Sequence, residues 1–191
     1  SPLNIFEYGS GYSTVYFTRF LCQHNISYQW HSIDNNLVWH SKIKNLINTH
    51  DASQQVFLHV KEFLPYWQKP DWIENNPAVD CSKFSPQNDN ERHYIDFLST
   101  LKTKFDLILI DGRFRRRCLS EARNYLKPDG VVFVHDAVRR YYFSQNNMYR
   151  YSAYINGGKY SFIEKNPHQV WIGGQGDLVK TIIQKLEEIK N

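Results

Sequence analysis

Two glycines next to a carboxylate and two hydroxyls form the first group of residues that could do chemistry. The stretch IFEYGSGYST, residues 5–14, passes from an apolar segment through Glu7 to Gly9 and Gly11, and then to a Ser-Thr pair. Glycine lets the backbone adopt positive φ or approach a ligand closely, and a Ser or Thr hydroxyl commonly caps the start of a helix. The stretch predicts a strand, a tight loop and a helix N-terminus around a ligand, although a turn without a ligand would give the same pattern.

A second carboxylate follows the next apolar segment. Asp34 ends the segment HSID, 23 residues after Gly11. An acid at such a position can accept hydrogen bonds from both hydroxyls of a ribose, as in nucleotide-binding sheets. Alternatively, Asp34 and the two asparagines after it would cap the next helix.

Acidic and imidazole side chains follow two later apolar segments. Asp111 ends FDLILID, and His135 and Asp136 end VVFVHD. Histidine commonly exchanges a proton near neutral pH, so His135 is a candidate general base. The structural alternative is a histidine at a strand end that is held by a hydrogen bond.

Arginines follow the same two segments. Residues 113–117 read RFRRR, and Arg139 and Arg140 come after the second segment. Arg113 and one of the later pair, Arg139 or Arg140, could bind a carboxylate or phosphate of a substrate with paired hydrogen bonds. The other arginines of the run, Arg116 and Arg117, fit a solvated helix face.

Short apolar runs alternate along the chain with longer amphipathic segments. This alternation is typical of a parallel sheet with crossover helices, which would position the residues described above. The pattern predicts strands near 3–8, 28–34, 55–60, 105–111 and 130–135, and helices over 13–24, 37–48, 90–102 and 114–126, the last of them ended by the turn KPDG at 127–130. Ligands of such sheets bind beyond the carboxyl ends of the strands, where we expect the polar groups to converge.

The last part of the chain predicts a different arrangement. Residues 149–164 and 168–173 suit two strands with a turn at 156–158, followed by a helix over 177–189. An antiparallel hairpin that closes the sheet fits this pattern. Residues 61–90 are rich in Pro, Asn and Asp and predict an insertion loop. No second-domain boundary is visible, so we expect residues 1–191 to form a single domain.

Composition narrows the class of protein. The chain has 191 residues, of which 41% are hydrophobic, and its three cysteines form no C-x-x-C pair. It has no apolar run near the length of a membrane span and no secretion signal, so we expect a cytoplasmic protein that does not enter a membrane. The formal charge of +4 is small and no recognition module is visible, which disfavours a nucleic-acid partner.

Taken together, FEYGSGYST, Asp34, FDLILIDG and LKPDGVVFVHD resemble the successive motifs of class I S-adenosylmethionine-dependent methyltransferases. The resemblance implies an α/β fold, with a Rossmann-like, doubly wound, mostly parallel seven-stranded sheet, an antiparallel C-terminal hairpin and helices on both faces. GYST, IDGRFR and the later HD are similar to a group of bacterial methyltransferase-like proteins and, more distantly, to plant enzymes that methylate sugars.

The resemblance also implies roles for individual residues. Asp34 would bind the ribose of S-adenosylmethionine, and Asp111 would lie near the sulfonium and the methyl acceptor. Adenine contacts would come from residues 60–63 or 85–89. The amino-acid end of the cofactor would be surrounded by Glu7, Tyr8, Gly9, Ser10, Gly11 and Ser13. Tyr8 and Tyr12 are larger than the residues common at these places and would narrow the crevice or shield the cofactor.

The implied activity is methyl transfer from S-adenosylmethionine, and we expect the acceptor to be an oxygen of a small molecule or saccharide. In metal-dependent relatives, carboxylates at the places of Asp111 and Asp136 hold a divalent ion, for which Mg²⁺ is the candidate here. The sequence His135-Asp136-Ala137 departs from the usual Asp-Asp or Asp-Asn pair, which leaves His135 as the alternative base.

Two other functions stay open. One is a methyltransferase-like domain that binds the cofactor or a partner without catalysis. The other is an NAD-dependent oxidoreductase, which is disfavoured because GSGYST lacks the third Gly or Ala of the dehydrogenase motif.

Overall fold

The computed structural model describes residues 1–49, 55–63, 88–137, 148–155 and 170–189. Its helices and strands follow one another in the order β1 (Leu3–Tyr8), α1 (Tyr12–Gln23), β2 (Tyr28–Asp34), α2 (Leu37–Asn48), β3 (Val56–Val60), α4 (Asp89–Ile95), α5 (Phe97–Thr100), β4 (Phe105–Ile110), α6 (Arg115–Tyr125), β5 (Leu126–Val134), β6 (Tyr151–Tyr154), β7 (Trp171–Gly174) and α8 (Asp177–Ile189).

The strands form one seven-stranded sheet in the order β3-β2-β1-β4-β5-β7-β6. Strands β1 to β5 are parallel to one another, whereas β7 runs antiparallel to both β5 and β6. The chain therefore has the predicted Rossmann-like, doubly wound sheet with antiparallel C-terminal strands. All described elements belong to this sheet or pack on it, and the interpretation of residues 1–191 as one domain stays a prediction.

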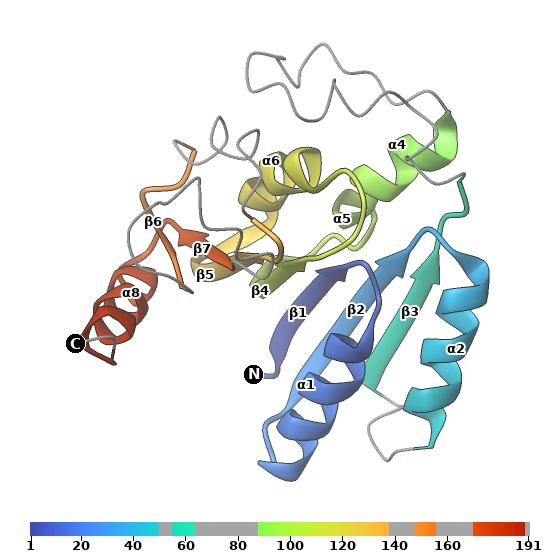
Figure 1. Ribbon diagram of the computed structural model, residues 1–191, viewed down its shortest axis with the longest axis horizontal. Helices are drawn as coiled ribbons and strands as arrows, with labels where there is room; N and C mark the ends of the chain where they lie inside the picture. The colour runs from blue at the N-terminus through green and yellow to red at the C-terminus, as the bar shows by residue number, and fades with distance from the viewer. Residues whose placement is uncertain (50–54, 64–87, 138–147, 156–169, 190–191) are drawn as a thin grey trace.

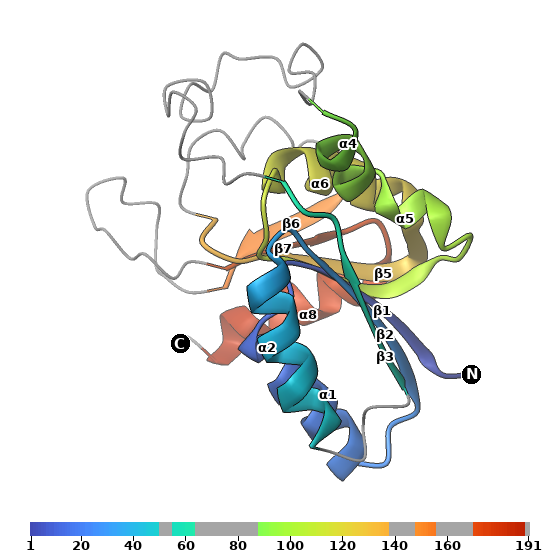
Figure 2. The same cartoon turned by 90° about the vertical axis from the view of Figure 1, so that its right-hand side faces the viewer.

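Helices cover both faces of the sheet, as the two ribbon views show (Figures 1 and 2). Helices α1, α2 and α8 lie on one face, and α4, α5 and α6 lie on the other. The alternation of side chains along each strand divides the apolar residues between the faces. The largest core cluster lies under α4–α6, with side chains from the middle of the sheet such as Phe6, Ile108 and Val132.

Several element boundaries differ from the predicted ones. The helix expected over 90–102 is divided at Asp96, which ends α4 and precedes α5. Strand β5 begins at Leu126, so the expected turn at 127–130 lies inside the strand, where its register with β4 shifts between Phe105 and Leu107. The last two strands, β6 and β7, are shorter than expected. The turn predicted at 156–158 and residues 64–87 of the insertion lie outside the described residues.

The register of the central strands places four strand ends in one row. Tyr8 pairs with Ile33 on one side and with Ile110 on the other, and Ile110 pairs with Val134. The residues that follow these positions are Gly9, Asp34, Asp111 and His135. The polar groups singled out by the sequence therefore meet at the carboxyl edge of the sheet.

Candidate active site

The glycine loop between β1 and α1 is shaped by a close approach of two backbone segments. Gly9 has a φ of 92°, and a Cβ atom on it would lie 2.5 Å from the Cα of Gly112, in the turn after β4. Space at Gly9 is therefore used by the protein's own backbone rather than left for a ligand. A Cβ atom on Gly11 would meet Ser13 Oγ at 3.5 Å, an ordinary van der Waals contact, so Gly11, unlike Gly9, is not packed tightly against another backbone segment.

Glu7 is a fully buried carboxylate at the base of this loop. Its Oε1 accepts a hydrogen bond from Ser13 Oγ at 2.5 Å, and its Oε2 accepts bonds from Thr14 Oγ1 at 2.5 Å, Ser32 Oγ at 3.0 Å and Trp30 Nε1 at 3.2 Å. Burial raises the pKa of Glu7 to about 7, although these four hydrogen bonds favour the charged form. Glu7 therefore joins β1, β2 and the first turn of α1 beneath the loop.

The loop is also held from α2. The Trp39 indole donates a hydrogen bond from Nε1 to the carbonyl oxygen of Ser10 at 2.6 Å, and Ser10 Oγ lies 2.9 Å from Ser32 Oγ. Sequence reasoning did not single out Trp39. The available signal was its place in the first turn of the helix that follows Asp34.

The two tyrosines beside the glycines lie in opposite environments. Tyr8 is fully buried, and its hydroxyl donates to the carbonyl oxygen of Ile95 at 2.6 Å on the α4–α6 side of the sheet. Its side chain belongs to the core, so the expectation that it narrows the crevice or shields the cofactor is wrong for this side chain. Tyr12 is exposed, and its ring meets the Trp39 ring edge-on at 5.7 Å, beside the glycine loop.

Asp34 is buried at the end of β2, next to the glycine loop. Its Oδ1 accepts a hydrogen bond from the backbone N–H of Asn36 at 2.8 Å. Burial raises the pKa of Asp34 to about 6, and backbone hydrogen bonds from Asn36, Asn35 and Ser10 and the charge of Arg113 offset part of the increase. The helix cap is Asn36, whose side chain accepts from the Trp39 N–H, so α2 does not need Asp34 as its cap.

The environment of the Asp34 carboxylate fits the cofactor that the motifs imply. A buried carboxylate with a raised pKa gains from hydroxyl donors that stabilise its charged form, and the two hydroxyls of a ribose are such donors. Asp34 also lies beside Ser10 of the glycine loop, whose backbone hydrogen-bonds to it.

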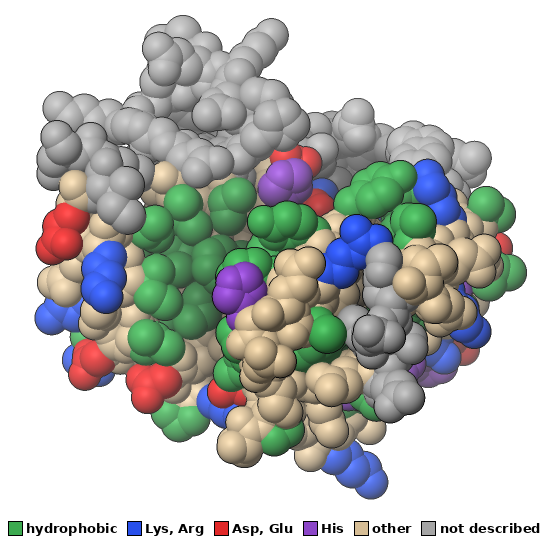
Figure 3. Space-filling model, turned by 90° about the horizontal axis from the view of Figure 1, so that it is seen from below, with side chains coloured by type: hydrophobic (Ala, Val, Ile, Leu, Met, Phe, Trp, Pro, Cys, Tyr) green, Lys and Arg blue, Asp and Glu red, His purple; other side chains and the backbone are tan. Residues whose placement is uncertain are grey.

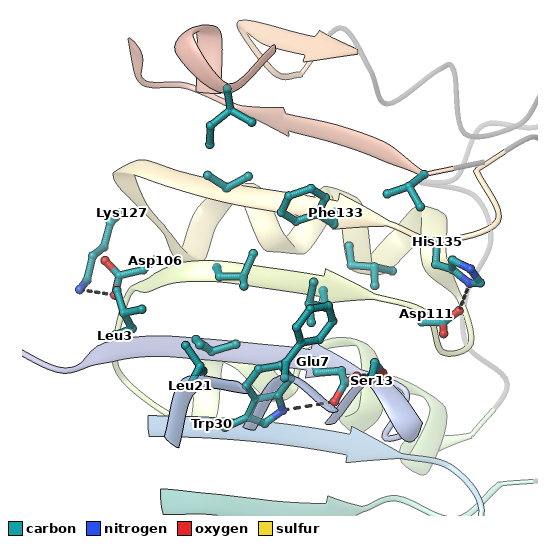
Figure 4. A pocket seen from close by; sticks show the side chains of 18 of the residues that line it. Leu3, Glu7, Ser13, Leu21, Trp30, Asp106, Asp111, Lys127, Phe133 and His135 are labelled. Carbon is teal, nitrogen blue, oxygen red and sulfur yellow. Dashed lines mark hydrogen bonds and ion pairs between the residues drawn. The ribbon is translucent and has the colours of Figure 1, made fainter. Parts of the chain in front are cut away.

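Asp111 and His135 form a close pair at the ends of β4 and β5 (Figure 4). His135 Nδ1 lies 2.9 Å from Asp111 Oδ1 and 3.7 Å from Asp136 Oδ1. The three side chains are 42%, 40% and 36% exposed, in the order His135, Asp111, Asp136, so a ligand can reach them. Asp136 has a φ of 52°, a left-handed conformation uncommon outside glycine.

The guanidinium of Arg115, the first residue of α6, contacts the residues that follow both β4 and β5. It donates from Nε to the carbonyl oxygen of Gly112 at 3.0 Å, and from Nη2 to the carbonyl oxygen and to Oδ1 of Asp111 at 2.9 and 3.0 Å. Its Nη1 donates to the carbonyl oxygen of His135 and lies 3.6 Å from Asp136 Oδ2. Sequence reasoning placed Arg115 in a basic run but gave it no role.

Of the two arginines expected to bind substrate, Arg113 and Arg139, the structure describes only Arg113. Arg139 lies outside the described residues. The charge of Arg113 lowers the pKa of Asp34, so Arg113 acts on the β2 side of the site, and its backbone N–H donates to the Tyr94 hydroxyl at 3.2 Å. Its expected role in substrate binding stays a prediction.

An open groove of about 1000 Å³ leads to the Asp111–His135 pair along the face of the sheet that carries α1 and α8. Figure 3 shows this hollow from below as a gathering of hydrophobic side chains, and Figure 4 shows its lining. The floor and walls include Ile5, Phe17, Phe20, Leu107, Leu109, Val131, Phe133, Leu178 and Ile182, with Glu7 and Ser13 at the end near the pair. The sequence signal for the groove was the apolar character of both faces of β4 and β5.

None of the helices in the described part of the chain is long and apolar enough to cross a membrane.

The sequence between β1 and the end of β5 matches a known family. Residues 6–137 match the family model described as "Methyltransferase domain". No curated protein is significantly similar to this chain in sequence.

Solved structures with the same fold include two that are described as O-methyltransferases and one domain of a polyketide synthase. The O-methyltransferase TomG from Streptomyces achromogenes, solved with S-adenosylmethionine, matches with a TM-score of 0.57 and 14% identity over 91% of this chain and 73% of its own. The O-methyltransferase from Bacillus cereus, solved with S-adenosylhomocysteine, matches with a TM-score of 0.57 and 13% identity over 88% of this chain and 72% of its own. The CMeT domain of the citrinin polyketide synthase has a TM-score of 0.56 and 12% identity over 92% of this chain, which spans 47% of that domain's chain. At these identities the likeness shows the fold.

Proposed function

The chain belongs to the methyltransferase-domain family, as a class I S-adenosylmethionine-dependent methyltransferase, and on this premise we propose that it methylates an oxygen of a small molecule or saccharide. The observation that carries the proposal is the Asp111–His135 pair, 2.9 Å apart and partly exposed at the sheet edge that also bears Asp34 and the glycine loop. Both O-methyltransferases compared above support oxygen as the acceptor atom.

The cofactor would occupy the β1–β2 half of the edge. When bound, S-adenosylmethionine supplies an activated methyl group, so the protein has to align donor and acceptor and to remove one proton. Asp34 would accept hydrogen bonds from the ribose hydroxyls, and the backbone at Ser10 and Gly11 would face the amino-acid end. Glu7 and Trp39 would keep this loop in place without touching the cofactor.

The acceptor would lie at the β4–β5 half of the edge. Asp111 accepts a hydrogen bond from Nδ1–H of His135, which orients the ring and leaves Nε2 as the nitrogen that takes the proton. The acceptor oxygen would take the methyl group that the bound cofactor supplies, and the acceptor's proton would go to His135 Nε2. The products would be the methyl ether or ester and S-adenosylhomocysteine.

The first test separates cofactor binding from methyl transfer. Calorimetry with S-adenosylhomocysteine, with NAD as the control, should give binding of the first ligand alone. Methyl-labelled S-adenosylmethionine should then transfer label to a member of a panel of phenols, hydroxy acids and saccharides. No binding of S-adenosylhomocysteine would contradict the proposal, and binding without transfer to any panel member would favour the non-catalytic alternative.

The second test addresses the role of His135. We expect His135→Gln to lower kcat about 10²–10⁴-fold, the usual range for a general base, with unchanged affinity for S-adenosylhomocysteine. His24→Gln is the matched control, because His24 is an exposed residue at the far end of α1. Equal turnover of the two variants would remove His135 from the reaction.

A further inference from the structure

Three candidate metal ligands lie together in the acceptor half of the site. Each of Asp111, His135 and Asp136 offers a ligand atom, and these atoms all lie within 4.8 Å of one another. Two carboxylates and an imidazole can bind a divalent ion. Whether these three residues can form the Mg²⁺ site that the motifs suggest depends on what else lies between them.

A positive charge already lies between the two carboxylates. Arg115 Nη2 is 3.0 Å from Asp111 Oδ1, and Arg115 Nη1 is 3.6 Å from Asp136 Oδ2. The Arg115 side chain is only 17% exposed, and a guanidinium does not lose its proton in proteins. The charge at this point is therefore permanent.

Backbone contacts fix this guanidinium in place. It donates to the carbonyl oxygens of Gly112 and Asp111, after β4, and to that of His135, after β5. Phe114 takes a left-handed φ of 51° just before α6, so Arg115 is the first residue of that helix and its side chain reaches back over both strand ends. These contacts resist the displacement of Arg115 by an incoming ion.

The geometry does not suit Mg²⁺. This ion needs a nearly octahedral set of oxygen ligands at about 2.0–2.1 Å and keeps several of its waters. Here Asp111 Oδ1 already accepts from Arg115 and pairs with His135 Nδ1, and an ion bound between the carboxylates would lie against the guanidinium. Repulsion between the two cations and the loss of these hydrogen bonds both oppose the ion.

We propose that Arg115 is the built-in cation of this site, held between Asp111 and Asp136 where a divalent ion would otherwise bind, so that the site works without a metal. This inference rests on the proposed function only in placing the acceptor here. Arg115 is a positioning residue: it fixes the Asp111 carboxylate, which in turn orients His135.

Metal binding tests this assignment without reference to activity. The wild type, Arg115→Met and the control Arg117→Met are titrated with Mn²⁺ and with Mg²⁺ by calorimetry, and paramagnetic broadening of the His135 ring signals by Mn²⁺ is followed by NMR. Arg117→Met removes one positive charge from the same helix, but the charge of Arg117 acts on Glu121 instead. We expect Arg115→Met to bind Mn²⁺ at least tenfold more tightly than the wild type and the control, with selective broadening of His135.

Two results would overturn the proposal. One is micromolar binding of Mn²⁺ or Mg²⁺ to the wild-type protein with broadening of His135, which is measured on the wild type and so does not depend on the folding of any variant. The other is equal metal affinity of folded Arg115→Met and Arg117→Met.

A second variant separates charge from positioning. Arg115→Lys keeps the positive charge but cannot form the paired contacts to both strand ends. We expect it to remain as poor a metal binder as the wild type while its methyl transfer falls, with a lower kcat and an unchanged affinity for S-adenosylhomocysteine. Metal affinity that rises in Arg115→Lys as it does in Arg115→Met would contradict the role of the charge. Absence of methyl transfer in the wild type would instead contradict the proposed function, leaving the metal result intact.

Discussion

The two halves of the carboxyl edge handle negative charge in opposite ways. In the β1–β2 half, Glu7 and Asp34 are buried, and burial raises the pKa of Glu7 to about 7 and that of Asp34 to about 6. In the β4–β5 half, Asp111 and Asp136 are partly exposed and lie against the guanidinium of Arg115.

In the proposed function, this difference separates cofactor binding from proton transfer. Hydroxyl, indole and backbone donors surround the first pair, and the charge of Arg113 also acts on Asp34; in the proposed function these donors hold the loop and the cofactor in fixed geometry. The second pair is compensated by the full positive charge of Arg115 and stays accessible beside His135, the residue proposed to take the proton. Substitutions can therefore perturb each half of the carboxyl edge separately.

Removal of the Glu7 carboxylate should have the largest effect on stability. Glu7→Ala leaves three buried donors, the side chains of Thr14, Ser32 and Trp30, without this acceptor, and orphaned donors cost about 1–3 kcal/mol each. Because the variant also relieves the burial of the carboxylate, we expect the free energy of unfolding to fall by about 2–4 kcal/mol in urea denaturation at pH 6. Glu187→Ala, on the exposed face of α8, is the control and should change little.

The raised pKa of Glu7 also predicts a pH dependence with a definite sign. The ordinary pKa of this carboxyl group is 4.5, and in the folded chain it is about 7. Between pH 4.5 and about pH 7, Glu7 has therefore lost its proton in the unfolded chain but keeps it in the folded chain. Glu7 therefore stabilises the fold at low pH, and this contribution is lost as the pH rises through 7. The difference in unfolding free energy between the wild type and Glu7→Gln should fall from pH 5 to pH 8; a difference that is constant or grows would show that Glu7 is ionised in the fold.

Asp34 should have the next largest effect, on cofactor affinity rather than on stability. Asp34→Ala should weaken binding of S-adenosylhomocysteine by about 1–3 kcal/mol, in line with charged hydrogen bonds to the ribose. Since these bonds need the carboxylate, wild-type affinity should also fall as the pH drops below about 6, whereas Asp34→Asn should lack this dependence. Calorimetry between pH 5 and 8 measures both, and unchanged affinity in Asp34→Ala would remove the ribose assignment.

Trp39→Phe should give the smallest change. The variant keeps an aromatic ring but loses the Nε1 donor to the Ser10 carbonyl, a hydrogen bond of about 0.5–1.5 kcal/mol. A looser glycine loop should weaken S-adenosylhomocysteine binding about two- to tenfold in calorimetry. Tyr12→Leu removes the ring contact with Trp39 but leaves this hydrogen bond in place, and it should bind like the wild type; the same loss in both variants would mean that the aromatic contact, and not this hydrogen bond, holds the loop.

Sequence reasoning predicted the fold well because the pattern behind it is local. Apolar runs, helix periodicity and the polar residues after each run identified the five parallel strands and placed Asp34, Asp111 and His135 at their ends. Boundaries were less accurate where the tertiary structure overrides local preference, as at 127–130, where pairing with β4 extends β5 back to Leu126.

The amino-acid sequence by itself determined the family, the parallel sheet and the edge at which its polar residues meet, since these depend on periodicity and short motifs. Only the tertiary structure decided what surrounds each residue. Gly9 is packed against Gly112, Tyr8 points into the core, and Arg115 spans two strand ends. The physical reason is that burial and charge pairing arise from segments far apart in the chain, whose contacts form only when the sheet brings them together.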